Sequence, residues 1–306
     1  MKIKATSPLR VSLFGGSTDI ESFYKVYGGL TISMAINLRQ EVEISDEYVE
    51  HRLLDSDNKE FFKIFSQELK IDHLGITHKF DASSESGLGS SAALAVALVG
   101  AARKYHNLSM DRLEIATDAK NIEIEKCKLF GGFQDQIISA FGGMNLITFG
   151  KKVEVKPIDK AIAENIANHL LLFDTGLRRT NSKLQENLKE LNEVRIFSLM
   201  SIKSYAIEAY KNLTDIDFLA ELLQLSWYFK KNSNKVSTPE IDKIYDEALK
   251  VGAMAGKLNG SGGGGFMSFW AKPAIQGDII RALEEFGCKH YDYSIDWQGL
   301  DVRRVL

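Results

Sequence analysis

The sequence has little of what marks several large protein classes. Its 306 residues include only two cysteines, Cys127 and Cys288, so a disulfide framework is excluded and both are expected to be buried free thiols. The most apolar stretch, residues 92–102, is about half as long as a bilayer-spanning helix. The first ten residues are polar and mixed in charge, unlike a secretory signal peptide. These features favour a cytoplasmic protein that does not enter a membrane.

An excess of charge of one sign is also missing. The 38 lysine and arginine residues stand against 41 aspartates and glutamates, which gives a net charge of −3. Because no basic stripe stands out, the sequence gives no support for a nucleic-acid partner. A small anionic substrate must therefore be held by local groups. The length suits one large domain or two ordinary ones, and a homodimer stays open.

Strand and helix patterns follow one another without regular alternation, which favours an α+β fold over a doubly wound sheet. Short apolar and β-branched runs predict strands at 3–5, 9–14, 76–80, 144–149, 170–174 and 266–270, and near 290 and 302. A Ser-Pro turn should separate the first two strands, and 30–45 should be a strand or a hairpin. Apolar spacing and capping residues predict helices at 91–102, 109–127, 179–212, 238–258 and 276–286, with a short one from 134.

A glycine- and serine-rich loop precedes the alanine-rich helix. It consists of Gly87, Leu88, Gly89, Ser90, Ser91 and Ala92. A helix start offers unpaired N–H groups and a positive dipole end, and glycines let phosphate oxygens approach the backbone. Serine hydroxyls can bind phosphate or a magnesium ion. We therefore expect a phosphate loop that binds ATP rather than an ordinary helix cap.

The same loop also fits a looser motif. Gly87, Gly89 and Ala92 match the dinucleotide fingerprint G-x-G-x-x-[GA], which requires an acidic residue at the end of a second strand. Asp111 and Glu114 lie at about the right distance, but in the start of a predicted helix. The dinucleotide interpretation is therefore disfavoured. A Walker loop is absent from the sequence.

Two carboxylates and a glycine run complete the candidate chemistry. Glu123 and Asp135 could hold magnesium and orient or deprotonate an acceptor hydroxyl, as phosphoryl transfer requires. Gln134 and Gln136 flank Asp135 and are expected to fix it by hydrogen bonds. The run Asn-Gly-Ser-Gly-Gly-Gly-Gly at 259–265 precedes a predicted strand and indicates close backbone approach to a ligand.

A segment near the start of the chain, the glycine-serine loop and the glycine run resemble, in this order, the three motifs of the GHMP kinases, the superfamily of galactokinase, homoserine kinase, mevalonate kinase and phosphomevalonate kinase. The first motif is Pro-Leu-Arg-Val-Ser-Leu-Phe-Gly-Gly-Ser-Thr-Asp at 8–19, the second spans 86–93 and the third 257–266. Gly-Gly-Phe-Gln-Asp-Gln at 131–136 and Ala-Phe-Gly-Gly at 140–143 resemble the sugar 1-kinases of the heptose 7-phosphate kinase type.

The resemblance implies an α+β fold of two domains with the active site in the cleft between them. These would be a ribosomal-protein-like α/β domain at 1–155 and a ferredoxin-like α+β domain at 156–306. It also implies an enzyme that uses ATP and Mg²⁺ to phosphorylate the anomeric hydroxyl of a sugar or sugar phosphate. D-glycero-D-manno-heptose 7-phosphate, converted to the 1,7-bisphosphate, is the first expectation. The alternatives are another sugar such as fucose or galactose, a non-sugar alcohol such as mevalonate, and a catalytically silent ligand sensor.

The resemblance also assigns roles to residues. Asp135 would be the catalytic base or orient the acceptor, and Arg10 would stabilise charge in the transition state. Ser90, Ser91 and Glu123 would hold the metal. The substrate would contact Gly15, Gly16, Ser17, Asp19, Gln134, Thr175, Gly176, Arg179, Gly262, Gly263 and Gly264.

Overall fold

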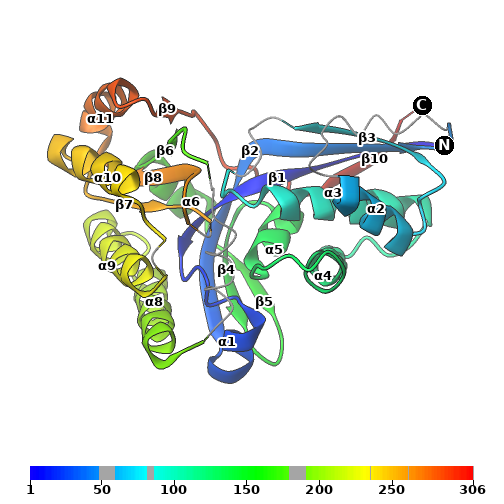
Figure 1. The fold of residues 1–306 in the computed structure, drawn as a ribbon, viewed down its shortest axis with the longest axis horizontal. Helices are drawn as coiled ribbons and strands as arrows, with labels where there is room; N and C mark the ends of the chain where they lie inside the picture. Colours follow the sequence, from blue (N-terminus) through cyan, green and yellow to red (C-terminus); the bar gives the residue numbers. More distant parts are fainter. Residues whose placement is uncertain (48–58, 81–85, 179–190, 235, 261, 306) are drawn as a thin grey trace.

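The computed structural model describes residues 1–47, 59–80, 86–178, 191–234, 236–260 and 262–305. Helices and strands are mixed along these residues, and the strands form two separate sheets (Figure 1). This arrangement confirms the expected α+β class. None of the described helices is both long and apolar enough to cross a membrane.

The first sheet is antiparallel and contains the longest strands. Its order is β10-β1-β2-β4-β5, and β3 also pairs with β2. The strands are β1 (Lys2–Phe14), β2 (Gly29–Ser45), β3 (Gly75–Phe80), β4 (Met144–Phe149), β5 (Glu154–Pro157) and β10 (Asp301–Val305). The end of the chain therefore completes the sheet that the beginning of the chain starts, and the two termini lie close together in Figure 1.

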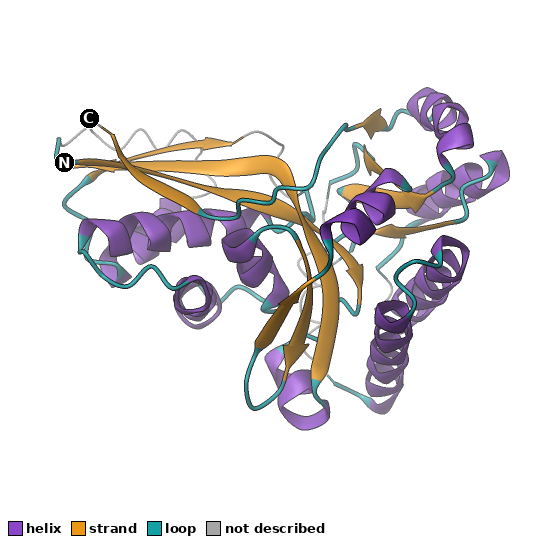
Figure 2. Ribbon diagram, turned by 180° about the vertical axis from the view of Figure 1, so that it is seen from behind, coloured by secondary structure: helices purple, strands orange, loops and turns teal. Residues whose placement is uncertain are grey.

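Helices cover one face of this sheet, as the view from behind also shows (Figure 2). They are α2 (Lys59–Glu68), α3 (Ser90–Tyr105), α4 (Arg112–Asn121) and α5 (Gln134–Phe141). The small side chains of α3 are buried from Ala92 to Ala102, which lets the helix approach β1 and β2 closely. The short helix α1 (Glu21–Tyr27) lies beside the start of β2.

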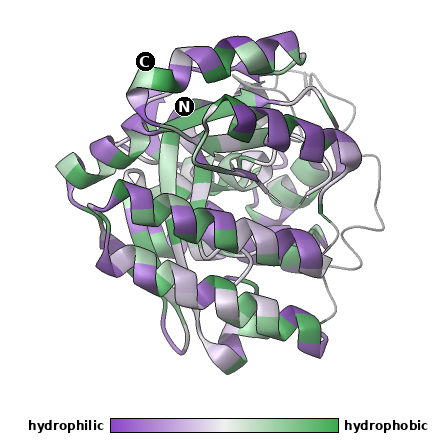
Figure 3. Ribbon diagram, turned by 90° about the vertical axis from the view of Figure 1, so that its left-hand side faces the viewer, coloured by the Kyte–Doolittle hydropathy of each residue, from purple (hydrophilic) through white to green (hydrophobic). Residues whose placement is uncertain are grey.

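The second sheet has the order β7-β8-β6-β9. Its strands are β6 (Leu170–Asp174), β7 (Ala255–Leu258), β8 (Phe266–Trp270) and β9 (Lys289–His290). The helices of this half are α6 (Lys160–Asn168), α8 (Glu193–Lys211), α9 (Ile216–Asn234), α10 (Pro239–Val251) and α11 (Pro273–Glu285). Figure 3 shows hydrophilic and hydrophobic residues mixed along them, as expected for helices with one buried face.

The two sheets share one hydrophobic cluster. The second half of β1 contributes Leu9, Val11, Leu13 and Phe14 to the cluster that also holds residues of β6 and β8. The rings of Phe14 and Trp270 lie 6.4 Å apart between centroids. Because β1 is packed into both halves, the site that it carries is fixed relative to both.

Several predicted boundaries were wrong, each for a local reason. No Ser-Pro turn interrupts β1, because Pro8 lies at a register shift in the pairing with β2, where its missing N–H is tolerated. The helix predicted over 238–258 ends at Val251, since Gly252 adopts a left-handed conformation (φ 119°) and residues 255–258 form β7. Of the two alternatives for 30–45, a strand or a hairpin, the strand is confirmed.

The helix predicted over 109–127 is also different. It begins at Arg112 with Asp111 as its N-cap, ends at Asn121, and continues as a π-helix from Ile122 to Lys126. The strands expected at 76–80, 144–149, 170–174 and 266–270 are confirmed, as is the helix cap formed by Thr238 and Pro239.

Candidate active site

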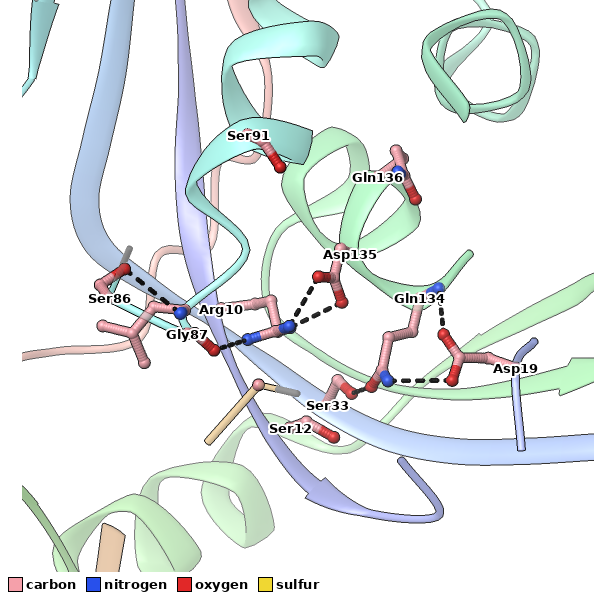
Figure 4. Close-up of polar contacts among 12 residues, drawn as sticks. Arg10, Ser12, Asp19, Ser33, Ser86, Gly87, Ser91, Gln134, Asp135 and Gln136 are labelled. Carbon is pink, nitrogen blue, oxygen red and sulfur yellow. Dashed lines mark hydrogen bonds and ion pairs between the residues drawn. The ribbon is translucent and has the colours of Figure 1, made fainter. Parts of the chain in front are cut away.

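Arg10 and Asp135 form the centre of the candidate site (Figure 4). Arg10 is buried on β1, and Asp135 is in the first turn of α5. The Arg10 guanidinium donates from Nε to Asp135 Oδ1 (2.7 Å) and from Nη2 to Asp135 Oδ2 (2.6 Å). This two-bond geometry fixes the carboxylate, whose side chain keeps 23% of its surface exposed. The pair is therefore preorganised and still reachable by a ligand.

The glycine-serine loop lies directly against this pair. Arg10 Nη1 donates to the carbonyl of Gly87 (2.7 Å), and the Arg10 backbone N–H donates to the carbonyl of Leu88 (2.9 Å). Gly87 and Gly89 have positive φ values of 74° and 75°. A Cβ at Gly89 would lie 3.3 Å from both Arg10 Cγ and Asp135 Oδ2, so a side chain there would crowd the pair. Gly89 is also the N-cap of α3, whose first N–H groups have no partner within the helix and are suited to bind an anion.

The two serines of the loop point to different partners. Ser91 Oγ, on an exposed residue, donates to Glu123 Oε1 (2.6 Å). Ser90 Oγ instead accepts from Gln40 Nε2 of β2 (3.0 Å). The buried Leu88 and Ala92 anchor the loop in the core.

Glu123 is a buried carboxyl group at the start of the π-helix. Its Oε2 accepts a hydrogen bond from Gln136 Nε2 (2.7 Å). Burial raises the pKa of Glu123 to about 7, against the opposing effect of the hydrogen bonds from Ser91 and Gln136. π-helical turns are rare in proteins, and those that occur are often found at functional sites. The π-helical turn at Glu123 is therefore consistent with a role for this carboxylate.

Asp19 forms a second buried carboxylate site. Its side chain accepts from the backbone N–H of Gln134 (3.0 Å) and from Gln134 Nε2 (3.2 Å). Gln134 Oε1 in turn accepts from Ser33 Oγ (2.6 Å). Burial raises the pKa of Asp19 to about 6, and the nearby charge of Asp135 adds to the rise. Gly132 leaves room for this carboxylate, because a Cβ there would lie 1.8 Å from Asp19 Oδ2.

A tight turn connects β1 to Asp19. Gly15 and Ser17 both have positive φ values, 76° and 74°. Gly16 lies close to Ser12, since a Cβ at Gly16 would lie 3.0 Å from Ser12 Oγ. Ser12 Oγ is buried and has no hydrogen-bond partner among the described residues. The turn thus brings Gly15, Gly16 and Ser17 to the Asp19 end of the site.

The third glycine run touches the phosphate loop through its first residues. A Cβ at Gly260 would lie 2.7 Å from Gly87 Cα, and a Cβ at Gly87 would lie 2.7 Å from the Asn259 carbonyl oxygen. Gly262 and Gly263 lie against Val236, and Gly264 lies against the backbone of Leu177.

Thr175 and Gly176 follow β6 and belong to this same corner. Thr175 Oγ1 donates to the carbonyl of Gly265 (2.7 Å), so the Thr175–Gly176 turn braces the glycine run. None of the hydrogen bonds described for the two residues joins Asp19, Gln134 or the Arg10–Asp135 pair. Arg179 lies outside the described residues.

The expectation that Gln134 and Gln136 hold Asp135 was wrong. Gln134 binds Asp19, Gln136 binds Glu123, and Arg10 holds Asp135. Successive residues of a helix point about 100° apart, so three neighbours at a helix start serve three different partners.

Some site residues were not foreseen from the sequence. They are Ser12, Ser33, Gln40 and Gly132. Only Ser12 carried a usable signal, because it lies two residues after Arg10 and therefore shares its face of the strand. Ser33 and Gln40 are on β2, and their roles depend on strand register.

Known proteins resemble the chain along its whole length. The sequence profile of the GHMP kinases N terminal domain matches residues 58–143, and that of the GHMP kinases C terminal domain matches residues 206–288. The chain is 32% identical to the D-glycero-alpha-D-manno-heptose 7-phosphate kinase of Campylobacter jejuni subsp. jejuni serotype O:2, with 99% of each chain covered.

Solved structures show the same arrangement. A crystal structure of a putative sugar kinase from Campylobacter jejuni has a TM-score of 0.76 and 30% identity, covering 99% of this chain and 98% of the other. The crystal structure of a D-glycero-D-manno-heptose 1-phosphate kinase from Bacteroides thetaiotaomicron has a TM-score of 0.80 and 24% identity, covers 99% of each chain, and supports the fold alone.

Proposed function

The chain belongs to the GHMP kinases, ATP-dependent kinases that act on a hydroxyl group, and from this premise we propose that it phosphorylates the anomeric hydroxyl of a sugar phosphate. The acceptor we propose is D-glycero-D-manno-heptose 7-phosphate, which would become the 1,7-bisphosphate. Support comes from the heptose 7-phosphate kinase that is 32% identical over 99% of both chains. The observation that carries the proposal is the Arg10–Asp135 pair held against the glycine-serine loop.

This pair supplies what direct transfer to a hydroxyl needs. Asp135 would orient the acceptor hydroxyl and take its proton, and Arg10 would keep the carboxylate aimed and stabilise the charge that develops. The loop at residues 87–92 would hold the ATP phosphates through the N–H groups at the start of α3. Positioning and charge neutralisation then account for most of the rate.

The donor set of the site fits Mg²⁺. Ser91 Oγ and Glu123 Oε1 lie 2.6 Å apart at the loop, and both are the oxygen ligands that Mg²⁺ prefers. No described group of three or more His, Cys, Asp or Glu side chains gathers to form a complete protein cage. Mg²⁺ bound here would take its other ligands from phosphate oxygens and water, and Ser90 would assist at the loop. When bound, it would neutralise phosphate charge during transfer.

The acceptor end is suited to a molecule with several hydroxyl groups. Asp19 and Gln134 use only part of their hydrogen-bonding capacity on each other, so both can still bind hydroxyls. We propose the following residues for contacts with the acceptor or the transferred phosphate: Gly15, Gly16, Ser17, Asp19, Gln134, Thr175, Gly176, Gly262, Gly263 and Gly264.

Two assignments on a larger scale belong to the same proposal. We place the division between the domains near residue 155, with β10 returning to the first sheet. We also propose a cytoplasmic location, where ATP is supplied, and a sugar phosphate as the small-molecule partner.

A release assay for ADP tests the proposal. The wild-type protein is offered heptose 7-phosphate, fucose, galactose, mannose, N-acetylhexosamines and mevalonate in turn, with MgATP. Turnover on heptose 7-phosphate should exceed turnover on every unphosphorylated sugar. Activity on mevalonate alone would show that the acceptor is a non-sugar alcohol. Tight ATP binding without turnover on any acceptor would favour a ligand sensor.

A further inference from the structure

Lys257 on β7 is a buried cation that the proposed reaction does not use. Only 8% of the residue is exposed, and its Nζ donates to the backbone carbonyls of Ser12 (2.6 Å) and Leu13 (3.4 Å). No carboxylate of the described residues pairs with it. Burial holds the pKa of Lys257 well below its ordinary range, and the charges of Lys230 and Arg10 lower it further. Its amine is thus committed to two backbone acceptors of β1.

These two acceptors lie where the β1 ladder becomes irregular. The pairing of β1 with β2 shifts register between Ser12 and Phe14, and Leu13 has no partner across the ladder. On the other side of β1, β10 pairs only with residues 2–6. Lys257 therefore supplies donors to a segment of β1 whose strand pairing is irregular. A neutral amine still carries N–H donors, so the contact does not require the positive charge.

The position of this contact links the two halves of the site. Two residues before Ser12, β1 carries Arg10, and the turn at Gly15 and Gly16 follows directly. On the other side, Gly260 contacts Gly87 of the phosphate loop, three residues after Lys257. A short segment from β7 into the glycine run thus touches both the acceptor side and the nucleotide side.

We propose that Lys257 is a positioning residue for phosphoryl transfer, because its amine ties β7 to the irregular end of β1 and so fixes the acceptor side of the site against the phosphate loop. This inference rests on the proposed kinase function. It requires no contact between Lys257 and either substrate. A displacement of about 1 Å between reacting groups can cost about 100-fold in rate, so loss of the tether should be visible in turnover.

The test compares Lys257→Met, which keeps most of the unbranched apolar stem but removes the donor, with Lys257→Gln, which keeps an N–H donor on a shorter side chain. Lys250→Met is the matched control, since Lys250 is an exposed residue of α10 paired with Glu247. For each variant, phosphate transfer to the acceptor that the wild type uses is measured together with ATP hydrolysis without acceptor. Amide hydrogen exchange over residues 11–16 is the second readout.

Lys257→Met should lower kcat for transfer by about 10- to 100-fold and raise the KM of the acceptor, with the KM of ATP and the basal hydrolysis within about twofold of wild type. Lys257→Gln should retain more transfer than Lys257→Met, and Lys250→Met should match wild type. Exchange over residues 11–16 should quicken most in Lys257→Met, less in Lys257→Gln, and not at all in Lys250→Met. If Lys257→Met does not fold, Lys257→Gln is compared with wild type instead. Its transfer-to-hydrolysis ratio should fall, and its exchange over residues 11–16 should quicken.

Equal transfer by Lys257→Met and wild type would overturn the inference, as would a parallel fall in transfer and hydrolysis. If the wild type transfers phosphate to no acceptor, the proposed function fails instead. Hydrogen exchange over residues 11–16 then tests the Lys257 contact independently of catalysis. Unchanged exchange in Lys257→Met would show that Lys257 does not hold this segment.

Discussion

Glu123 is a carboxyl group that folding removes from water with no cation beside it among the described residues. Its pKa is raised from 4.5 to about 7, so the native state binds a proton more readily than the unfolded chain between these values. The stability linked to this group is therefore fully present below pH 4.5 and is lost as the pH rises through about 7. Without bound metal at alkaline pH, the native protein bears the full free-energy cost of burying the Glu123 charge.

Replacing Glu123 by Gln should remove that cost. The amide can still accept from Ser91, and rotation of the Gln136 amide lets its unpartnered Oε1 accept from the new N–H. Without Mg²⁺, we expect Glu123→Gln to raise the free energy of unfolding by about 3 kcal/mol at pH 8 and by less than about 1 kcal/mol at pH 5. Urea unfolding at both pH values measures this difference.

The control for that experiment is Glu240→Gln. Glu240 is exposed in the first turn of α10, and hydrogen bonds from Thr238 and its own backbone N–H lower its pKa. This variant should lose stability at pH 8 rather than gain it. An equal gain in both variants, or a Glu123→Gln gain that does not depend on pH, would show that burial of Glu123 is not the cause.

The same carboxyl group should make the need for magnesium depend on pH. Mg²⁺ binds the carboxylate and not the carboxylic acid, so protonation of Glu123 below about pH 7 competes with the metal. We expect the Mg²⁺ concentration for half-maximal rate, at saturating ATP, to be several-fold higher at pH 6 than at pH 8. In Glu123→Gln this pH dependence should disappear along with most of the activity. Equal half-saturation at the two pH values in the wild type would argue against Glu123 as a ligand.

At the residue scale, the sequence identified the chemical groups better than their partners. The glycine-serine loop, Glu123 and Asp135 could be selected from residue type and spacing, and Arg10 from a family motif. The partners of Gln134 and Gln136 could not, because they depend on the phase of α5 and on the π-helical turn that begins at Ile122. Neither feature leaves a mark in the apolar periodicity on which helix prediction depends.

At the scale of elements, the contact between the two glycine loops leaves no space for a side chain. Gly260 has a φ of 71°, and a side chain there would press on the backbone of Gly87. We expect Gly260→Ala to lower the free energy of unfolding by about 1–3 kcal/mol and to raise the KM of ATP about tenfold or more, because the phosphate loop must move. Thermal or urea unfolding and steady-state kinetics measure the two effects.

Gly277→Ala is the matched control for this change. Gly277 lies inside α11, and a Cβ there would meet nothing within 4 Å. Alanine at this position should stabilise the helix by up to about 1 kcal/mol and leave the kinetics unchanged. If Gly260→Ala behaves as Gly277→Ala does, the two loops are not coupled as the contact implies.

Helices and strands were predicted accurately where a local apolar or β-branched pattern defines them. Prediction failed where a single residue ends the element. Strands with clear β-branched or apolar runs, such as Phe266–Trp270, were found with their bounds. The end of α10 was missed because the apolar pattern continues past the left-handed Gly252 into β7. The helix Ile216–Asn234 was not predicted at all, although it covers β7 and packs on α8.

At the scale of the molecule, the site depends on segments that are far apart in the chain. β1 pairs with β10, which lies almost 300 residues later, and packs its second half against β6 and β8. Local sequence patterns cannot reveal such pairing, since strand partners are chosen by tertiary packing. The α+β class followed from element order, whereas the two-domain arrangement came from the family resemblance. One strand thus carries Arg10, the Lys257 contact and the turn toward Asp19.

The most direct test of the kinase account is transfer of labelled γ-phosphate from MgATP to heptose 7-phosphate by the wild type and by Asp135→Asn. The wild type should form a 1,7-bisphosphate that ³¹P NMR identifies by its anomeric phosphate. Asp135→Asn should still bind ATP, with turnover lower by about 100- to 10,000-fold, because general base catalysis and the charged partner of Arg10 are both lost. A wild type that transfers no phosphate to the sugar, or an Asp135→Asn variant with near-normal turnover, would contradict the account.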